Sequence, residues 1–298
     1  MSQPLLPTTH ELSSFCNVSA LEAGKIGLPE KYYIDDFDES AVHRCPSLAF
    51  HLQHSGTGKR ILFDLGIPKD EDLIPPAAWK LVKEGGLTIE VAQDVSRSLQ
   101  IGGLDPIDID LIVLSHLHFD HWGDARPFTR ATFLLGAGSV HRLQSGYPPN
   151  PESFCRRDCV PTDRTTFLDP LSAEWQPVGP FPRALDFFQD GSFWIVDAPG
   201  HLGGHLNALV RTDSGWLFLA GDTVHDERLL NGERHICVYE DGGSAHVDLE
   251  AAREHLARVQ TLQRDYGVPV IFSHPQGWDE RHPEAYFPGT IDASKALR

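Results

Sequence analysis

The chain has 298 residues, of which 41% are hydrophobic and 22% charged, and this is the composition of an ordinary globular protein. Its formal net charge of −17 argues against nucleic acid or an anionic membrane as the main partner, because like charges repel. No apolar run approaches the length of a membrane span, and Met1 to Phe15 lacks the basic start and apolar core of a signal peptide.

The five cysteines are scattered, and their odd number fits a reduced, cytoplasmic location better than a disulfide-bonded exported protein. Cys155 and Cys159 are close enough in sequence to form a local metal or redox pair. Because no second pair accompanies them, we expect them to be ordinary thiols in a loop.

The N-terminal part of the chain is expected to hold a strand and then a hairpin. The first strand covers about Glu11 to Ala20. The acidic, aromatic patch 32–37 either lines a pocket or subunit contact or packs on the core, and we favour packing. The runs 47–54 and 59–64 resemble paired strands, joined by serine and glycine residues that suit a turn.

Residues 67–88 are rich in proline and charged residues, and we expect them to form a connection. A helix is predicted from about Glu90 to Leu99, and the glycine pair that follows should end it. Farther along the chain, 132–135 reads as a short strand and 139–143 as the start of a helix.

The strongest chemical signal comes directly after four aliphatic residues, 111–114, which predict a strand buried on both faces. Four potential metal ligands follow within six positions: His116, His118, Asp120 and His121. Imidazole and carboxylate together suit zinc, manganese, iron or cobalt better than calcium or magnesium. A histidine-rich surface loop is the alternative, but the end of a buried strand is where α/β enzymes place their chemistry.

Residues 144–190 are rich in proline and aromatic residues and show little periodicity. A long segment of this kind inside a domain is usually a binding loop or a lid. We therefore expect a lid-like insertion that covers the active site and sets substrate choice. A passive surface excursion is the alternative.

The second half of the chain repeats the plan of an apolar run followed by a ligand. The runs 193–196, 216–220 and 268–272 precede His201, Asp222 and His274 in turn. Between the last two ligands, apolar residues at helical spacing predict a helix from Asp248 to about Tyr266, with Asp248 capping its start and Gly267 its end.

These motifs resemble those of the metallo-β-lactamase superfamily. His116-X-His118-X-Asp120-His121 is similar to its signature, and Ala-Pro-Gly-His201, Phe-Leu-Ala-Gly-Asp222-Thr and Ile-Phe-Ser-His274 are similar to its later motifs, in the same order. The resemblance implies an αββα sandwich, in which two mixed sheets lie face to face with helices outside. It also implies that residues 1–298 form a single domain.

The resemblance further implies a binuclear metal centre. One divalent ion would be held by His116, His118 and His201, the second by Asp120, His121 and His274, and Asp222 would bridge the two. Zinc is the expected metal, with manganese, iron or cobalt as alternatives. The implied reaction is attack of a metal-bridging hydroxide on a substrate carbonyl, which needs no serine or cysteine nucleophile.

Two residues near the motifs are expected to support this centre without binding metal. Asp64 resembles the family's early Asp-x-Gly loop, where a carboxylate orients a ligand histidine by accepting its other N–H. The alternative is an aspartate that caps a turn. His205 follows His201 by four residues, but the ligand set is already full, so we expect a structural hydrogen bond.

Within the superfamily, the closest resemblance is to the N-acyl-homoserine lactonase branch and to fungal lactamase-like relatives. Those lactonases carry a tyrosine three residues after the bridging aspartate, where this chain has His225. The candidate catalytic residues are therefore Asp120 and His225, although an ordinary loop histidine is the alternative for the latter. Because histidine can transfer a proton near neutral pH, cyclic amides and carbamates are expected as substrates almost as strongly as lactones.

The expected function is a zinc-dependent hydrolase that opens a small cyclic ester, acting as a monomer or homodimer on a small-molecule partner. A lactamase of the detoxifying type, or a thioesterase acting on an acyl thioester, is the alternative. An iron-dependent oxygenase also stays open, because a sequence does not name the metal.

Overall fold

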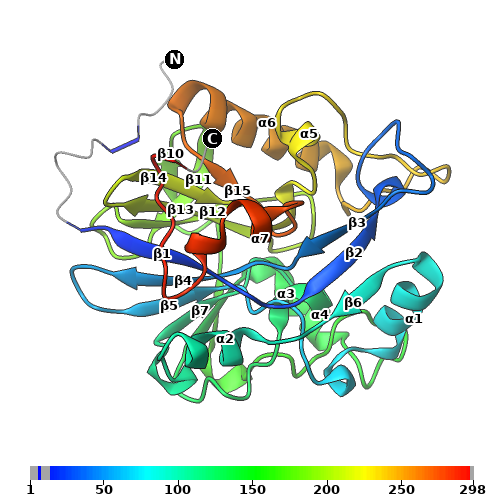
Figure 1. The fold of residues 1–298 in the computed structure, drawn as a ribbon, viewed down its shortest axis with the longest axis horizontal. Coiled ribbons are helices and arrows are strands. Elements are labelled where there is room, and N and C mark those ends of the chain that lie inside the picture. The colour runs from blue at the N-terminus through cyan, green and yellow to red at the C-terminus, as the bar shows by residue number, and fades with distance from the viewer. Residues whose placement is uncertain (1–5, 8–13, 296–298) are drawn as a thin grey trace.

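The computed structural model describes residues 6–7 and 14–295. Two six-stranded mixed sheets pack face to face and helices cover their outer sides, which confirms the expected αββα sandwich (Figure 1). A smaller three-stranded sheet lies beside them and consists of β3 (Val42–Pro46), β2 (Lys25–Pro29) and β6 (Thr88–Glu90).

The first large sheet begins with antiparallel strands and continues with parallel ones. Buried β7 lies inside this sheet, directly before the first ligand motif, as the aliphatic run predicted. The strand order is β1 (Cys16–Leu21), β4 (Ala49–His54), β5 (Arg60–Phe63), β7 (Leu111–Val113), β8 (Thr132–Gly136) and β9 (Thr165–Leu168).

The second large sheet is antiparallel except for its last pair, in which β14 and β15 run in the same direction. The strand order is β10 (Gln176–Val178), β11 (Phe181–Asp186), β12 (Phe193–Asp197), β13 (Leu206–Thr212), β14 (Gly215–Leu219) and β15 (Val270–Ile271).

The α-helices are short except for one. They are α1 (Pro76–Gly85), α2 (Val95–Ile101), α3 (Phe119–Trp122), α4 (Val140–Gln144), α5 (Glu227–Leu230), α6 (Leu249–Tyr266) and α7 (Trp278–Arg281). In the part of the chain that the structure describes, none of the helices is both long and apolar enough to cross a lipid bilayer.

Helix α6 matches its prediction and shows why the pattern was readable. The Asp248 side chain accepts a hydrogen bond from the backbone N–H of Ala251, and Gly267 ends the helix in the left-handed conformation with φ 65°. Leu256 and Val259 lie on its buried face, which packs against the outer side of the second sheet. Burying this stripe is what holds the helix in place.

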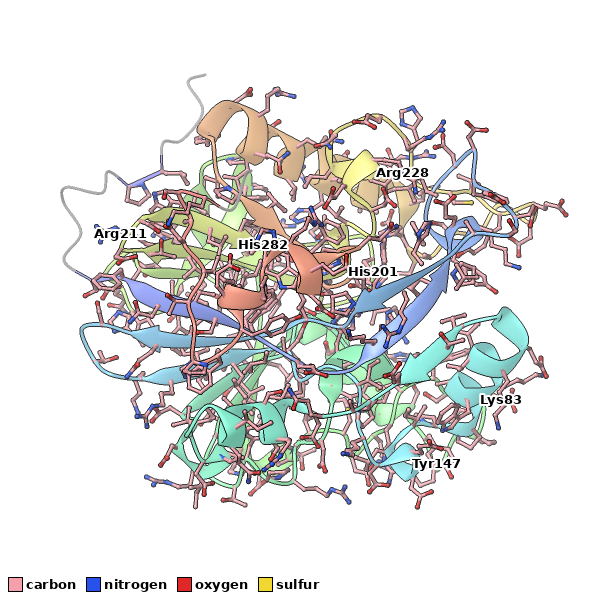
Figure 2. All side chains as sticks on the ribbon, viewed as in Figure 1. Lys83, Tyr147, His201, Arg211, Arg228 and His282 are labelled. Carbon is pink, nitrogen blue, oxygen red and sulfur yellow. The ribbon has the colours of Figure 1, made fainter. Side chains whose placement is uncertain are left out.

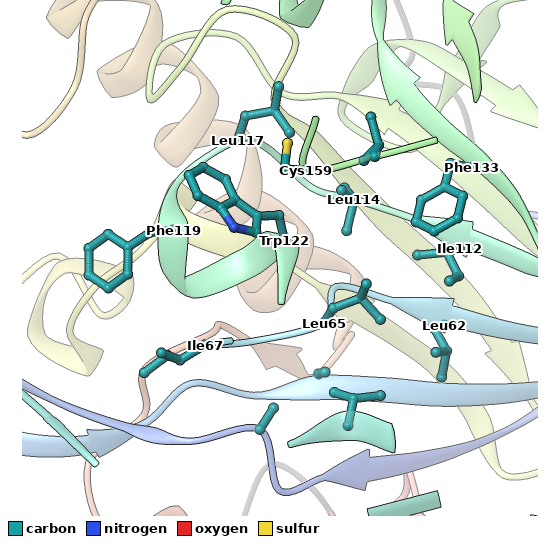
Figure 3. Close-up of a cluster of buried hydrophobic side chains, with 14 of the residues drawn as sticks. Leu62, Leu65, Ile67, Ile112, Leu114, Leu117, Phe119, Trp122, Phe133 and Cys159 are labelled. Atoms are coloured by element: carbon teal, nitrogen blue, oxygen red, sulfur yellow. The ribbon is translucent and has the colours of Figure 1, made fainter. Parts of the chain in front are cut away.

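Apolar packing also supports the segment that carries the first ligand motif. Trp122 of α3 is buried together with Leu114 and Leu117, and the cluster continues to Phe133 on β8 and to Cys159 (Figure 3). The strand end and the short helix that carry the ligands therefore rest on close-packed side chains, which limits their freedom to move.

The segment 144–190 differs from its prediction. It contains β9, β10 and β11, which pair within the two sheets, so its longest irregular stretch is about 145–164, which includes one short 3-10 turn. The pattern missed these strands because they lie at or near sheet edges, where side chains need not be apolar; β9 has only half-buried or exposed residues. That the remaining loop sets substrate choice stays a prediction.

Three smaller differences concern local structure near the N-terminus. Helix α1 lies inside the expected connection 67–88, and it begins with Pro76 at its first position, which proline favours. The helix predicted from Glu90 begins only at Val95, because Asp94 caps it and Glu90 belongs to β6. Strand β1 begins at Cys16, and the first three residues of its predicted range, 11–13, lie outside the described residues.

Candidate metal centre

The predicted ligands lie on the segments that follow β7, β12, β14 and β15, and two of them, Asp120 and His121, belong to α3. Since β12, β14 and β15 all run in one direction, their carboxyl ends meet at one edge of the second sheet. A hydrogen bond from Leu206 N–H to Ser115 O, 2.8 Å long, ties these loops to the loop after β7. His201 consequently lies near the middle of the molecule (Figure 2).

The first group of ligands brings three ring nitrogens together. Nδ1 of His118 lies 2.9 Å from Nε2 of His116 and 3.0 Å from Nε2 of His201, and the two Nε2 atoms are 3.2 Å apart. Each ring nitrogen either carries a proton or has a free lone pair. At least two of the three nitrogens must therefore be in the same state, and two nitrogens in the same state cannot form a hydrogen bond with each other.

A cation resolves this conflict, because it accepts all three lone pairs at once. Three nitrogens at tetrahedral angles, each about 2.0 to 2.1 Å from a zinc ion, would lie about 3.3 Å apart. The observed separations of 2.9 to 3.2 Å are close to that value. The residues present therefore fit a bound divalent metal.

The second group consists of Asp120, His121 and His274. Oδ2 of Asp120 lies 3.4 Å from Nε2 of His274 and 3.9 Å from Nε2 of His121. The atoms His121 Nε2 and Asp222 Oδ1 are buried and have no hydrogen-bond partner among the described residues, although they lie 3.3 Å apart. Such orphaned atoms are expected where a cation would normally satisfy them.

Asp222 lies between the two groups with one oxygen toward each. Its Oδ1 is 3.4 Å from Nε2 of His274, whereas its Oδ2 is 3.5 Å from Nε2 of His201 and 3.7 Å from Nε2 of His116. A carboxylate in this position can join two metal ions. All seven predicted ligands thus converge in two adjoining groups.

Asp64 orients His121 from behind. Its carboxylate accepts hydrogen bonds from the N–H and the hydroxyl of Ser115, at 2.6 and 2.7 Å, and lies 2.9 Å from Nδ1 of His121. A carboxylate only accepts, so Nδ1 carries the proton and Nε2 is left bare for a metal. The geometry is the one expected of an orienting carboxylate, and it differs from a turn cap.

His205 makes the structural hydrogen bonds that were expected of it. Its Nδ1 lies 3.1 Å from the carbonyl of Ala198, and its Nε2 accepts from the N–H of Asp222 at 3.3 Å. Both ring nitrogens are therefore occupied, and burial lowers the pKa of His205 to about 3. The neutral ring holds the backbone of Asp222 in position.

The charges of the site suit a metal. Burial lowers the pKa of His116, of His201 and, to about 4, of His118, so these rings are neutral and ready to bind. Burial also opposes a charge on His121, yet Asp222, Asp120 and Asp64 raise the pKa of that ring well above its usual value. The carboxylates therefore favour positive charge at this place, and a metal ion would supply it.

A cavity of about 370 Å³ opens onto this centre. Its walls are mainly apolar and aromatic, and Tyr32 and Tyr33 are among them. Tyr33 is only 2% exposed and also packs in the core of the second sheet, so both interpretations of the aromatic patch hold for it. Phe154, from the loop 145–164, lines the same cavity.

His225 lies beside Asp222, as its position three residues later in the sequence suggested. Its Nε2 is 3.2 Å from Oδ2 of Asp222, and its Nδ1 is buried without a partner among the described residues. By contrast, Cys155 and Cys159 are buried in the apolar cluster below α3, and in residues 6–7 and 14–295 they join no candidate metal group.

Two residues near the centre belong to no motif and were missed. His246 is 4% exposed, its ring packs 5.0 Å from that of His201, and neither of its nitrogens has a partner among the described residues. Arg142 lines the cavity. Neither residue directly follows a strand or has the sequence spacing of a metal ligand, so the sequence pattern did not indicate a role for either of them.

Comparison with known proteins identifies relatives of the chain. The family model of the metallo-beta-lactamase superfamily matches residues 44–274. The chain is 33% identical over 187 residues to the gamma-lactamase FDB1 of Fusarium pseudograminearum, a match that covers 60% of this chain and 45% of that protein. The chain thus spans about half the length of this relative.

Two further comparisons concern lactonases. The chain is 29% identical over 254 residues to the N-acyl homoserine lactonase AttM of Agrobacterium fabrum, which covers 75% of this chain and 89% of that protein. A crystal structure of B. thuringiensis AiiA with N-decanoyl-L-homoserine at its active site superposes with a TM-score of 0.68, covering 93% of this chain and 99% of that one. At 18% identity, this likeness shows the fold alone.

Proposed function

Because the chain belongs to the metallo-beta-lactamase superfamily, we propose that it is a binuclear metal-dependent hydrolase that opens the ring of a small cyclic ester. The observation that carries this proposal is the convergence of seven histidine and aspartate side chains at the base of an apolar cavity. The lactonase relative supports the same substrate class, and the γ-lactamase relative supports a cyclic amide as the second candidate.

Zinc is the metal that this donor set suits best, since imidazole and carboxylate ligands in small groups are typical of zinc sites. One ion would be held by His116, His118 and His201 and the other by Asp120, His121 and His274, with Asp222 in contact with both. When bound, the two ions would polarise the substrate carbonyl and lower the pKa of a water molecule from about 15.7 to about 7.

The residues of the chain supply the surroundings of this reaction. Asp120 and Asp222 offset part of the metal charge, and the neutral rings of the first group leave the rest uncompensated, which keeps the centre electrophilic. The apolar walls, with Tyr33 and Phe119 among them, bury the body of a substrate and exclude water.

His225 favours the cyclic amide as the second candidate. Its ring lines the cavity beside Asp222, within reach of a group that leaves the carbonyl carbon. An amine leaves poorly unless it is protonated, whereas an alkoxide can leave without a proton. We assign His225 the delivery of a proton to the leaving atom.

A His225→Phe variant should therefore lower kcat by about 100-fold on a lactam, within the range of general acid catalysis, and less on a lactone. Phenylalanine keeps most of the ring and removes both nitrogens. Steady-state kinetics on both substrates, together with metal analysis, would test this. An unchanged rate on the lactam would remove His225 from the reaction, and loss of metal would give it a structural role instead.

Metal analysis and substrate profiling on one preparation test the proposed function directly. We expect about two zinc ions per chain and hydrolysis of a γ-lactone, an acyl-homoserine lactone or an aryl-fused lactam, and a chelator should abolish this activity until zinc is restored. An acyl thioester belongs in the same panel, because preferred cleavage of it would favour the thioesterase. One iron per chain with oxygen-dependent turnover would contradict the hydrolase.

A further inference from the structure

Arg142, in the short helix α4, is a cation in the wall of the cavity. Its side chain is half-buried and lines the same cavity as His118, Asp120 and Asp222. Among the described residues it is the only lysine or arginine that does so.

No carboxylate balances this charge. In the part of the chain that the structure describes, Arg142 has neither a hydrogen bond nor an ion pair, and burial lowers the pKa of its guanidinium. Two other partly buried arginines have acidic partners: Arg228 binds Glu30 and Asp226, and Arg183 binds Asp197. Arg164, also partly buried, instead donates to the backbone carbonyls of Phe128 and Ala131. Holding an unpaired cation partly out of water is unfavourable, so folding alone gives no reason to keep one here.

The charge of the centre makes this cation more unusual. With the two metal ions of the proposed function bound, Asp120 and Asp222 neutralise only part of the metal charge, and Arg142 adds to the excess. A positive cavity in a protein of net charge −17 attracts anions locally while the rest of the surface repels them. A neutral lactone would leave Arg142 desolvated and still unpaired.

The rest of the cavity limits what kind of anion would fit. Leu81, Leu87, Phe119 and Phe154 line it together with three tyrosines, so the wall offers a large apolar area and one guanidinium. The volume of about 370 Å³ suits a small organic molecule. An apolar or aromatic body that carries one anionic group matches this wall in both respects.

We propose that the substrate carries, apart from the ring that is opened, an anionic group that is bound by Arg142. A carboxylate is the group we favour, because the planar guanidinium can donate two parallel N–H bonds to its two oxygens. This inference rests on the proposed function for the ring-opening reaction. It makes Arg142 a residue that determines specificity by binding the substrate away from the reacting atoms.

Matched substrates test this assignment. A γ-lactone with an aryl side chain that ends in a carboxylate would be compared with the same lactone ending in a primary amide. For Arg142→Gln, kcat/KM on the carboxylate should fall by about 10- to 100-fold, mainly through KM, and kcat/KM on the amide should change by less than about 3-fold. Arg142→Lys should lie between, because it keeps the charge and loses the paired donors.

Arg130→Gln is the matched control. Arg130 is exposed and does not line the cavity, so the variant makes the same change in net charge without touching the site. It should leave both substrates unaffected. Metal content and thermal unfolding of every variant would show that fold and metal centre are intact. Equal losses on both substrates, or no loss on either, would overturn the proposal.

A binding measurement separates this proposal from the ring-opening function. Calorimetry with 3-phenylpropanesulfonate, a weak metal ligand, and with neutral 3-phenylpropanol requires no turnover. If the metal-loaded wild type opens no ring yet binds the sulfonate at least about 10-fold more tightly than Arg142→Gln does, the anion site stands and the reaction is wrong. Equal binding of the sulfonate to both proteins would overturn the anion site itself.

Discussion

A His118→Ala variant is expected to lose metal and turnover together, with kcat/KM falling by about three orders of magnitude. Metal ions contribute several kcal/mol of transition-state stabilisation, and about 4 kcal/mol corresponds to a factor of about 10³. His118 Nδ1 lies within 3.0 Å of both partner nitrogens of its group, so removing it leaves two histidines and Asp222 to hold the ion. Elemental analysis and steady-state kinetics on one sample measure both losses.

The exposed histidine His141 provides the control for this variant. His141→Ala also removes an imidazole from the chain, but His141 is not part of either candidate metal group. It should retain metal and full activity. If His118→Ala kept both ions and full activity, the assignment of the first metal group would be refuted.

An Asp64→Asn variant is expected to lower the affinity of the second metal group by about 10- to 100-fold, the usual effect of losing a group that orients a ligand. Asp64 is 0% exposed and accepts from three donors: the N–H of Ser115, its hydroxyl and Nδ1 of His121. An asparagine amide has only one oxygen, so its NH₂ group would face at least one of these donors. Titration against a competing chelator measures the metal affinity.

The same change should also lower the free energy of unfolding by about 1 to 3 kcal/mol, because a buried donor loses its acceptor. Asp64 has φ 64°, a left-handed conformation that asparagine tolerates and alanine does not, so Asp64→Ala should be less stable still. Ser115→Ala keeps the contact between Asp64 and His121 and should affect metal affinity less. Unchanged metal affinity in Asp64→Asn would mean that His121 is held by packing alone.

The sequence was informative wherever chemistry followed directly on a buried strand. His116, His201, Asp222 and His274 each come within a few residues of an apolar run that proved to be β7, β12, β14 or β15. Because the connections are short, these side chains must lie close to the ends of the strands. Helix α6 was readable for a related reason, since its cap and its apolar stripe are both local features.

Prediction from sequence failed where strands and helices lack a continuous apolar face. Strand β10 buries only Val178 of its three residues, and β9 buries none, so 144–190 looked irregular although both strands complete the sheets. Helix α1 buries only Ala78 and Val82, and its two leading prolines suggested a loop. Backbone pairing and packing against neighbours stabilise these elements, and neither leaves a strong periodic signal.

The identity and order of the metal-binding motifs can be recognised in the amino-acid sequence, because the ligand types and their places after buried strands are local properties. Which residues support the centre from distant positions in the chain depends on the three-dimensional fold. Asp64 and His121 are 57 positions apart and meet because β5 and β7 are neighbours in one sheet. Arg142 reaches the cavity of His118 because α4 packs beside it, and packing of this kind depends on the whole fold and on no local pattern.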